Sequence, residues 1–332
     1  MKDYIEHKLM RYYGMELLDL KRIHMGHNEC FSGNGNNGSY FVKVFPIIEH
    51  MGVSNEVKYI EFLAGNFCVP QIVYTTKNDP FVVDEEEKRI ILVEKYVSGI
   101  VYDYNECPSF VLNESGKLLA NLHNASKKFE GNRVLDYSWI IQYRNAEVDC
   151  IKQMLSLISL NEDILYGERI ATDLNIKLKM CEETQDYVLM FKTLEYGMSH
   201  GDYCCTQWII DKDHIKCVTD FANCAEIPYV WELFRSYLQS SIECKDGYEI
   251  NIETLVQYIE KYNDIRKLSL YDLLKMPYIY VCWLSASTYG YKQFLDSGNK
   301  EYLEMAFWRT KICKTVLDNA REIEKRIREV FK

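Results

Sequence analysis

The sequence lacks several features that mark whole classes of protein. No stretch of its 332 residues is rich in lysine and arginine, and the net charge is −10. Proteins that bind nucleic acid usually carry a basic patch that neutralises phosphates, so we expect no nucleic-acid partner. An acidic balance mildly favours cationic partners. It still permits a single nucleotide to be held by local groups.

Paired metal-binding cysteines are also missing. The twelve cysteines are scattered from Cys30 to Cys313 without a CxxC pair, and the adjacent Cys204 and Cys205 are poorly placed to share one zinc ion. The first eight residues are charged and lack the apolar core of an export signal. We therefore expect free thiols in a reducing cytoplasm rather than a disulfide framework.

Long apolar runs, internal repeats and low-complexity linkers are absent too. The longest apolar runs, such as residues 278–286, fall well short of the roughly 20 residues that cross a membrane. We therefore expect no membrane association. Nothing in the sequence indicates an oligomeric state.

What is present indicates a folded enzyme-sized chain. Hydrophobic residues make up 48% and charged residues 27%, close to the averages of globular proteins. Aromatic residues at 14% argue against disorder. At this length we expect two domains or one large two-lobed unit.

The order of predicted elements indicates an α+β fold. Short β-branched or aromatic runs separated by turn residues predict strands at 17–23, 39–45, 71–75, 81–84 and 89–96, with one helix at 53–64. After Ser98 and Gly99 the pattern becomes helical, at 110–128, 147–160, 163–196 with a break near Gly167, and 302–331. A small hairpin is predicted within 198–220. The charged side of the last helix is expected to be a solvated face.

Three oxygen-bearing side chains flank this hairpin. Asp202 precedes it, Gln207 opens it, and Asp220 follows its second strand. A hairpin brings its two ends together, and Mg²⁺ prefers carboxylate and amide oxygens. Two carboxylates at hairpin ends are also common as local turn residues. The spacing therefore admits a metal site without requiring one.

One lysine stands in an apolar strand. Lys43 lies within Tyr40–Phe45 and is either an outward-facing residue, since strand faces alternate, or a phosphate-binding residue. A phosphate-binding lysine needs an acidic partner, and Glu56 on the following helix is the natural candidate, as in the Lys–Glu pair of kinases.

Taken together, these motifs resemble those of a known superfamily. His200-Gly201-Asp202, the amide side chain of Gln207 and Thr219-Asp220-Phe221 resemble the Brenner-type motif of the aminoglycoside phosphotransferase and choline kinase superfamily. The segments Ile227–Leu233 and Lys117–His123 are similar to two further segments of that superfamily. All of them occur in the family's order.

This resemblance implies a protein-kinase-like bilobal fold. Residues 1–97 would form a nucleotide-binding lobe with a small antiparallel sheet. Residues 98–332 would form a helical lobe with the catalytic loop, metal site and acceptor pocket. The implied activity is ATP-dependent phosphorylation of a hydroxyl group on a small molecule, such as an aminoglycoside, choline or another amino alcohol, or a sugar-like acceptor.

The resemblance also implies roles for individual residues. Asp202 would be the catalytic base or hydroxyl-orienting residue, Gln207 and Asp220 would be the Mg²⁺ ligands, and His200 would hold the catalytic loop. The family more often carries asparagine where this chain has Gln207. Maltokinase-like relatives resemble this chain in carrying glutamine, but the added methylene moves the amide oxygen of a geometrically strict ligand set.

Further residues are expected to contact the nucleotide. The segment 26–30, with Gly26 and Asn28, is the better candidate for a phosphate loop, whereas 33–38 reads as a tight turn and lacks the GxGxxG pattern. The segment 93–99 resembles the hinge, where backbone groups of Tyr96 and Val97 would bind adenine.

The acceptor and the overall activity leave alternatives open. Trp231, Glu232 and Arg235 follow the metal site and are either acceptor contacts or core residues with a satisfied ion pair. A non-catalytic kinase-like binding or structural protein, similar to spore-coat relatives, is the main alternative to an enzyme. A protein kinase is disfavoured because residues 220–231 leave little room for an activation loop.

Overall fold

The structure is a computed structural model that describes residues 1–23, 29–131, 133–161 and 163–331. The chain forms two compact units, which we call the N-terminal unit and the helical unit. The N-terminal unit comprises Met1–Val101, Lys128–Asn132 and Gln207–Cys224, and the helical unit comprises Tyr102–Lys127, Arg133–Thr206 and Ala225–Lys332. The division into lobes 1–97 and 98–332 stays a prediction.

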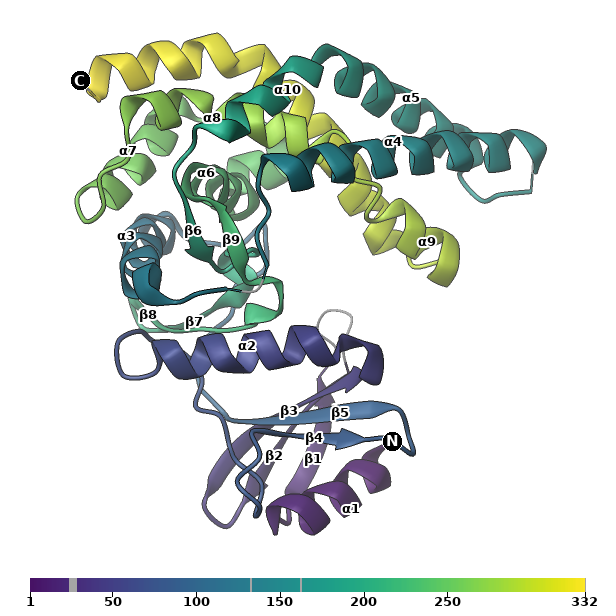
Figure 1. Ribbon diagram of the computed structural model, residues 1–332, viewed down its shortest axis with the longest axis vertical. Coiled ribbons are helices and arrows are strands. Elements are labelled where there is room, and N and C mark those ends of the chain that lie inside the picture. The colour runs from purple at the N-terminus through teal and green to yellow at the C-terminus, as the bar shows by residue number, and fades with distance from the viewer. Residues whose placement is uncertain (24–28, 132, 162, 332) are drawn as a thin grey trace. The chain divides into compact units, whose positions relative to one another are not determined.

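The N-terminal unit is built on a five-stranded antiparallel sheet in the order β1-β2-β3-β5-β4 (Figure 1). Its strands are β1 (Leu18–Ile23), β2 (Glu29–Gly35), β3 (Gly38–Pro46), β4 (Phe81–Asp84) and β5 (Arg89–Lys95). The predicted strand at 71–75 is wrong, because Ile72 forms only an isolated bridge to Glu94. The chain then turns at Thr75, whose hydroxyl accepts a hydrogen bond from the Asp79 N–H.

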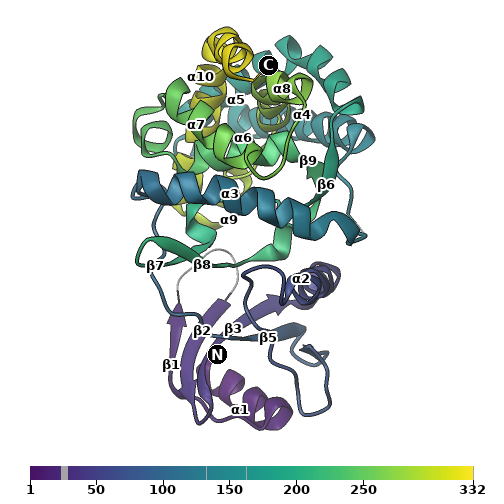
Figure 2. The ribbon, with the colours of Figure 1, turned by 90° about the vertical axis from the view of Figure 1, so that its left-hand side faces the viewer.

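A helix covers each face of this sheet (Figure 1 and Figure 2). The amphipathic helix α1 (Lys2–Tyr13) buries Ile5 and Leu9 against one face, together with Val42 and Val44 of β3. Helix α2 (His50–Leu63) covers the other face, to which Lys43 points because strand residues alternate. Helix α1 was not predicted, although its apolar residues recur every four positions as a helical stripe should.

The predicted hairpin is confirmed and belongs to the N-terminal unit. It consists of β7 (Trp208–Asp211) and β8 (His214–Val218), which pair in antiparallel register. The Val218 N–H donates to the Cys68 carbonyl oxygen at 2.9 Å, and Ile100 forms a bridge with Ile210. These bonds fasten the hairpin to the segments that follow α2 and β5.

The helical unit contains the long helices of the chain. They are α3 (Ser109–Ala125), α4 (Tyr137–Leu160), α5 (Gly167–Glu183), α6 (Tyr229–Ser240), α7 (Ile252–Asn263), α8 (Leu270–Leu284), α9 (Tyr291–Ser297) and α10 (Lys300–Val330). A two-stranded sheet of β6 (Tyr196–Ser199) and β9 (Ala225–Pro228), which was not predicted, leads into α6. Every residue of α6 is buried, and this helix packs against α3 and α8. The α+β fold class is therefore confirmed.

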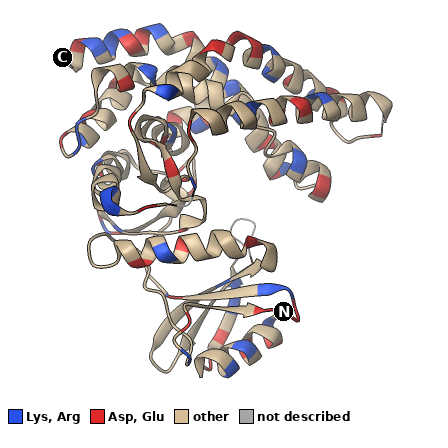
Figure 3. Ribbon diagram, in the orientation of Figure 1, with Lys and Arg blue, Asp and Glu red and all other residues tan. Residues whose placement is uncertain are grey.

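Charged side chains of both signs alternate along α10 (Figure 3). Its apolar stripe, which includes Ile312, Val316 and Ile323, is buried, so its charged side is the solvated face that was expected. All twelve cysteines are free, as expected. No helix in the described part of the chain contains an apolar stretch of the length that a membrane span requires.

Candidate active site

Each unit gathers its own set of the predicted functional residues. The N-terminal unit brings Lys43, Glu56, Gln207 and Asp220 into one region, and the helical unit holds Asp202. The helical unit also contains the three predicted acceptor residues on α6.

In the N-terminal unit, Lys43 lies between two buried carboxylates. Its Nζ atom is 2.8 Å from Glu56 Oε1 and 3.3 Å from Glu94 Oε1. Glu94 lies on β5 and was not predicted as a site residue. It follows Leu92, which pairs with Lys43, by two positions and therefore points to the same face of the sheet. The contact between Glu94 and Lys43 could not be predicted from the sequence without knowing that β3 pairs with β5.

Negative charge exceeds positive charge in this cluster. Burial lowers the pKa of the Lys43 ammonium, but the surrounding carboxylates outweigh burial and hold that pKa well above its usual value. Burial raises the pKa of Glu56 to about 7, against the attraction of Lys43, and the charges of Asp220 and Glu94 add to the increase. One ammonium thus faces three carboxylates, and the cluster would gain from an additional cation.

The ends of the hairpin bring the two predicted metal ligands together. The N–H and the hydroxyl of Thr219 both donate to the Gln207 carbonyl oxygen, at 2.9 and 3.2 Å. Asp220 follows directly and adopts a left-handed backbone conformation, with φ 64° and ψ 65°. Phe221 is fully buried and packs edge-on against Tyr59 of α2. This packing holds Asp220 in a conformation that few residues other than glycine, asparagine and aspartate adopt readily.

These residues fit a divalent cation that binds through a nucleotide. The described residues include no cluster of three or more metal-binding side chains. Mg²⁺ in phosphate-transferring sites typically takes one or two protein oxygens and completes its shell with phosphates and water. One carboxylate and one amide, beside a cluster with excess negative charge, match that requirement. Glu56 Oε2 is buried and forms no hydrogen bond within the described chain, which adds to the unmet demand for a positive partner.

In the helical unit, Asp202 is paired with a cation from α6. The guanidinium of Arg235 donates to Asp202 Oδ1, and the Arg235 side chain is 10% exposed, whereas the Asp202 side chain is 27% exposed. Arg235 also lies over the Trp231 ring, 5.7 Å from its centroid. Asp202 therefore has one oxygen fixed by an ion pair in a partly open position.

Glu232 holds the loop that carries Asp202. It is fully buried, and its carboxylate accepts hydrogen bonds from the N–H groups of His200 and Tyr203 at 3.0 and 3.3 Å. It also accepts from the Ser199 hydroxyl. The sequence-based prediction placed Glu232 among the acceptor contacts, but both of its oxygens are occupied by the loop, which favours a positioning role.

A chain of buried hydrogen bonds extends from Glu232 to α7. His123 Nε2 lies 2.5 Å from Ser199 Oγ, and His123 Nδ1 lies 2.6 Å from the Tyr262 hydroxyl. Since the Ser199 hydroxyl donates to Glu232, the geometry assigns the proton to Nε2 and makes Nδ1 the acceptor. Burial lowers the pKa of His123, which is consistent with a neutral ring.

Replacing Glu232 with glutamine is expected to lower the free energy of unfolding by about 3 kcal/mol, because buried donors lose a charged acceptor. Burial raises the pKa of Glu232, but the neighbouring His123, together with the charges of His200 and Arg235, outweighs burial, so the net pKa is lowered. A carboxyl group whose pKa is lowered on folding contributes its full stability above its pKa in the unfolded chain, near 4.5. This contribution is lost as the pH falls through its pKa in the folded protein. The difference between wild type and Glu232→Gln, measured by urea unfolding, should therefore narrow below about pH 4.5. Glu226→Gln on β9 is the control, and an equal loss in both variants would contradict the assignment.

The remaining predicted residues are those expected to contact the nucleotide. The Tyr96 N–H donates to the Ser39 carbonyl oxygen at 2.9 Å, so that donor is already used and only the Tyr96 carbonyl and Val97 stay candidates for adenine. Tyr96 is exposed and Val97 half-buried. Gly26 and Asn28, predicted for the phosphate loop, lie outside the described residues.

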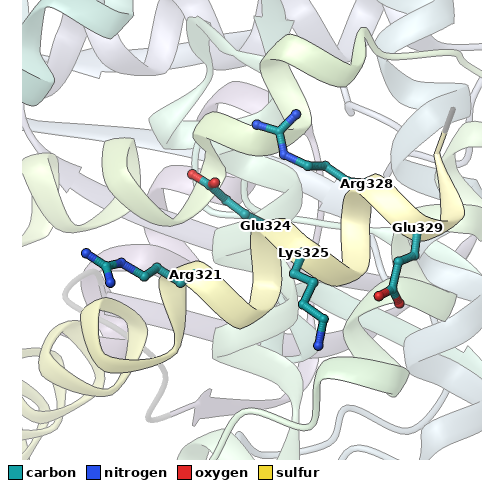
Figure 4. Close-up of a pocket in the computed structure, with 5 residues that line it drawn as sticks. All are labelled: Arg321, Glu324, Lys325, Arg328 and Glu329. Carbon is teal, nitrogen blue, oxygen red and sulfur yellow. The ribbon is translucent and has the colours of Figure 1, made fainter.

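A surface hollow elsewhere in the helical unit carries no such chemistry. It is lined by Arg321, Glu324, Lys325, Arg328 and Glu329, all from α10 (Figure 4). None of them belongs to the motifs, and the mixture of both charge signs selects no class of ligand.

Comparison of the sequence with family models and with curated proteins finds no match. Comparison of the fold with solved structures does. An amicoumacin kinase in complex with AMP-PNP, Ca²⁺ and Ami has a TM-score of 0.66 at 13% identity, covering 98% of this chain and 93% of that chain. A spectinomycin phosphotransferase in complex with ADP and spectinomycin has a TM-score of 0.65 at 14% identity, covering 97% and 98%.

A microcompartment-associated aminopropanol kinase is similar to the same degree, with a TM-score of 0.63 at 15% identity, covering 98% of this chain and 99% of that chain. At such low identities the likeness concerns the fold alone. The kinase-like α+β fold that the sequence motifs implied is therefore confirmed over almost the whole chain.

Proposed function

We propose that this chain, which has the fold of small-molecule phosphotransferases, transfers the γ-phosphoryl group of MgATP to a hydroxyl group of a small molecule. The observation that carries the proposal is the buried Lys43–Glu56 pair beside Asp220, in a chain that also presents Asp202 on a fixed loop. A purely structural protein has no need to bury an ammonium among three carboxylates.

Each residue has a role in this proposal. Lys43, fixed by Glu56 and Glu94, would contact phosphate oxygens, and Gln207 with Asp220 would hold the cation. Bound MgATP would supply the phosphoryl group together with the positive charge that the carboxylate cluster lacks. Asp202 would accept a hydrogen bond from the acceptor hydroxyl and orient its oxygen, while Arg235 fixes the carboxylate. Glu232 and His123 would keep the loop in place.

The neighbouring structures support the cofactor. The amicoumacin kinase is bound to AMP-PNP with Ca²⁺, and the spectinomycin phosphotransferase is bound to ADP. By analogy we propose ATP with Mg²⁺ for this chain, in a cytoplasmic enzyme.

Thermal unfolding with and without MgATP tests the proposal directly. A nucleotide at 100 times its dissociation constant stabilises the folded protein by about 2.7 kcal/mol. Transfer of labelled phosphate to a panel of amino alcohols, aminoglycosides, sugars and hydroxy acids then tests catalysis. Binding without transfer to any acceptor or to water would favour the non-catalytic alternative, to which Gln207 at the metal position lends some support. The absence of binding would rule out the enzyme.

Asp220→Asn is expected to stabilise the metal-free protein, by about 1 kcal/mol, while weakening Mg²⁺ binding. Asparagine tolerates the left-handed backbone, and the change removes one of the charges that raise the pKa of Glu56. Urea unfolding without ligand and with MgATP measures both effects, because the cation is proposed to bind together with the nucleotide. Asp213→Asn on the exposed hairpin turn is the control. A variant that is less stable without Mg²⁺, or equally stabilised by it, would contradict the proposed role.

A further inference from the structure

Two cations of the helical unit lie close to Asp202 without a carboxylate of their own. The Lys245 ammonium stands over the rings of Tyr104 and Trp308, 4.1 and 3.9 Å from their centroids. The Arg309 guanidinium stands over the ring of Tyr289 at 4.7 Å. Neither cation forms an ion pair within the described chain.

Both supporting tyrosines lie within the electrostatic reach of Asp202. The negative charge of Asp202 contributes to the raised pKa of Tyr104, after Cys204 and burial, and to that of Tyr289, after burial and Tyr302 and against the charge of Arg309. The contacts agree: Tyr104 follows Asp103, whose carbonyl oxygen accepts from the Cys205 thiol at 3.7 Å, and Trp308 precedes Arg309. Both cations therefore lie near the loop that carries Asp202.

Positive charge predominates in this region. The pKa of Lys245 is lowered to about 8, mainly by burial, and the charges of Arg309 and Arg235 contribute to the decrease. Three cations thus repel one another, and Asp202 is already paired with Arg235. Aligned cations with a single neutralising carboxylate are costly unless an anion joins them.

Hydrogen-bond donors without a partner lie in the same region. Arg235 Nη1, Trp231 Nε1 and the Tyr280 hydroxyl are buried and form no hydrogen bond within the described chain, on residues that are 8%, 5% and 0% exposed. Burial raises the pKa of Tyr280, and the charges of Arg235 and Arg309 both act to lower it, so the Tyr280 hydroxyl lies near these cations. Arg309 Nε is unpartnered as well. Buried donors left unpaired cost free energy, so such a group indicates a missing acceptor.

We propose that the substrate phosphorylated beside Asp202 is a hydroxylated small molecule that carries an oxyanion, a carboxylate or a phosphate, held by Lys245, Arg309 and the free edge of Arg235. This assignment rests on the proposed phosphotransferase function and narrows its acceptor. It runs against the cationic acceptors that the sequence left open, because an ammonium group would meet the cations of this cluster at short range. The hydroxyl would lie at Asp202, and the oxyanion would replace the missing acceptor.

Acceptor binding is measured first without nucleotide, by quenching of tryptophan fluorescence in the full chain at constant ionic strength. Gluconate and glycerol 3-phosphate are the two oxyanion probes and separate a carboxylate from a phosphate, whereas glucosamine and choline are the cationic probes. We expect one of the two oxyanions to bind more tightly than either cation. The double variant Lys245→Gln/Arg309→Gln should weaken that binding about 10- to 100-fold, because a hydrogen bond to a charged group is lost.

Two further variants keep the result interpretable. Lys325→Gln/Arg328→Gln removes two cations from the solvated face of α10 and should leave oxyanion binding unchanged. Lys245→Arg keeps the charge and should retain affinity within a few-fold, which separates loss of charge from loss of folding. Tighter binding of glucosamine or choline, or equal oxyanion affinity in wild type and the double variant, would overturn the inference.

A phosphotransfer assay distinguishes failure of the proposed oxyanion acceptor from failure of the proposed phosphotransferase function. With MgATP, label should appear on gluconate or glycerol 3-phosphate and not on glucosamine. Label on glucosamine alone would support the proposed phosphotransferase function and refute the oxyanion-carrying acceptor. Oxyanion binding that depends on Lys245 and Arg309, without MgATP binding, would support the anion site and refute the kinase.

Discussion

Asp202→Asn is expected to lower the rate of phosphotransfer by about 10²- to 10⁴-fold while leaving MgATP binding within a few-fold of wild type. Asparagine keeps the shape of the side chain and one acceptor for Arg235, but its amide cannot take a proton from a hydroxyl group. The measurement is single-turnover phosphate transfer to the acceptor that the panel identifies, with nucleotide affinity followed by thermal shift.

Asp264→Asn, an exposed position after α7, is the matched control and should be as active as wild type. If Asp202→Asn lost nucleotide affinity and kept its rate with saturating nucleotide, Asp202 would be a binding residue, and the proposed assignment would be wrong. A loss of folding is checked by urea unfolding, where we expect a destabilisation of about 1–3 kcal/mol, because the buried Arg235 exchanges a charged acceptor for a neutral one.

Lys43→Met is expected to destabilise the protein by about 3–5 kcal/mol at pH 8, a second large effect, and to abolish phosphotransfer. Methionine fills the space of the lysine stem, but Glu56 and Glu94 are then buried at 0% and 3% exposure without a cation. The measurement is urea unfolding at pH 5 and pH 8.

The pH dependence has a definite sign. The pKa of Glu56 is already raised to about 7 with Lys43 present, and loss of the cation raises it further. A raised carboxyl pKa contributes stability below the unfolded value near 4.5 and removes it as the pH climbs through the folded value. The deficit of Lys43→Met should therefore be smaller at pH 5 than at pH 8. Lys58→Met on the exposed side of α2 is the control, and an equal deficit at both pH values would contradict the buried cluster.

The sequence predicted local features of the fold and of the candidate site better than contacts between distant segments. The Lys43–Glu56 pair, the hairpin and the α+β fold class are present as predicted, because each follows from local spacing or from a motif. Glu94 was missed because its place beside Lys43 depends on the pairing of β3 with β5, which spans more than forty residues. Local patterns carry no information on such a register.

The sequence identified which residues belong to a motif more easily than it identified the role of each residue. Glu232 and Arg235 follow the metal motif closely and were grouped as acceptor contacts, but one turn of α6 separates a carboxylate bonded to backbone from a guanidinium bonded to Asp202. Only their hydrogen-bond partners in the folded chain distinguish the two residues. Likewise, no periodicity in the sequence connects Lys245 and Arg309, which come from different elements.

Because α6 is buried along its whole length, it constrains how a protein of this kind can change during evolution. Substitutions on α6 disturb the loop that carries Asp202, so few should survive selection. Lys245 and Arg309 are only partly buried and lie outside that helix, so they can vary without disturbing the loop. Divergence in the preference of the proposed acceptor site is therefore expected to accumulate at such positions, while the residues proposed to transfer phosphate stay the same.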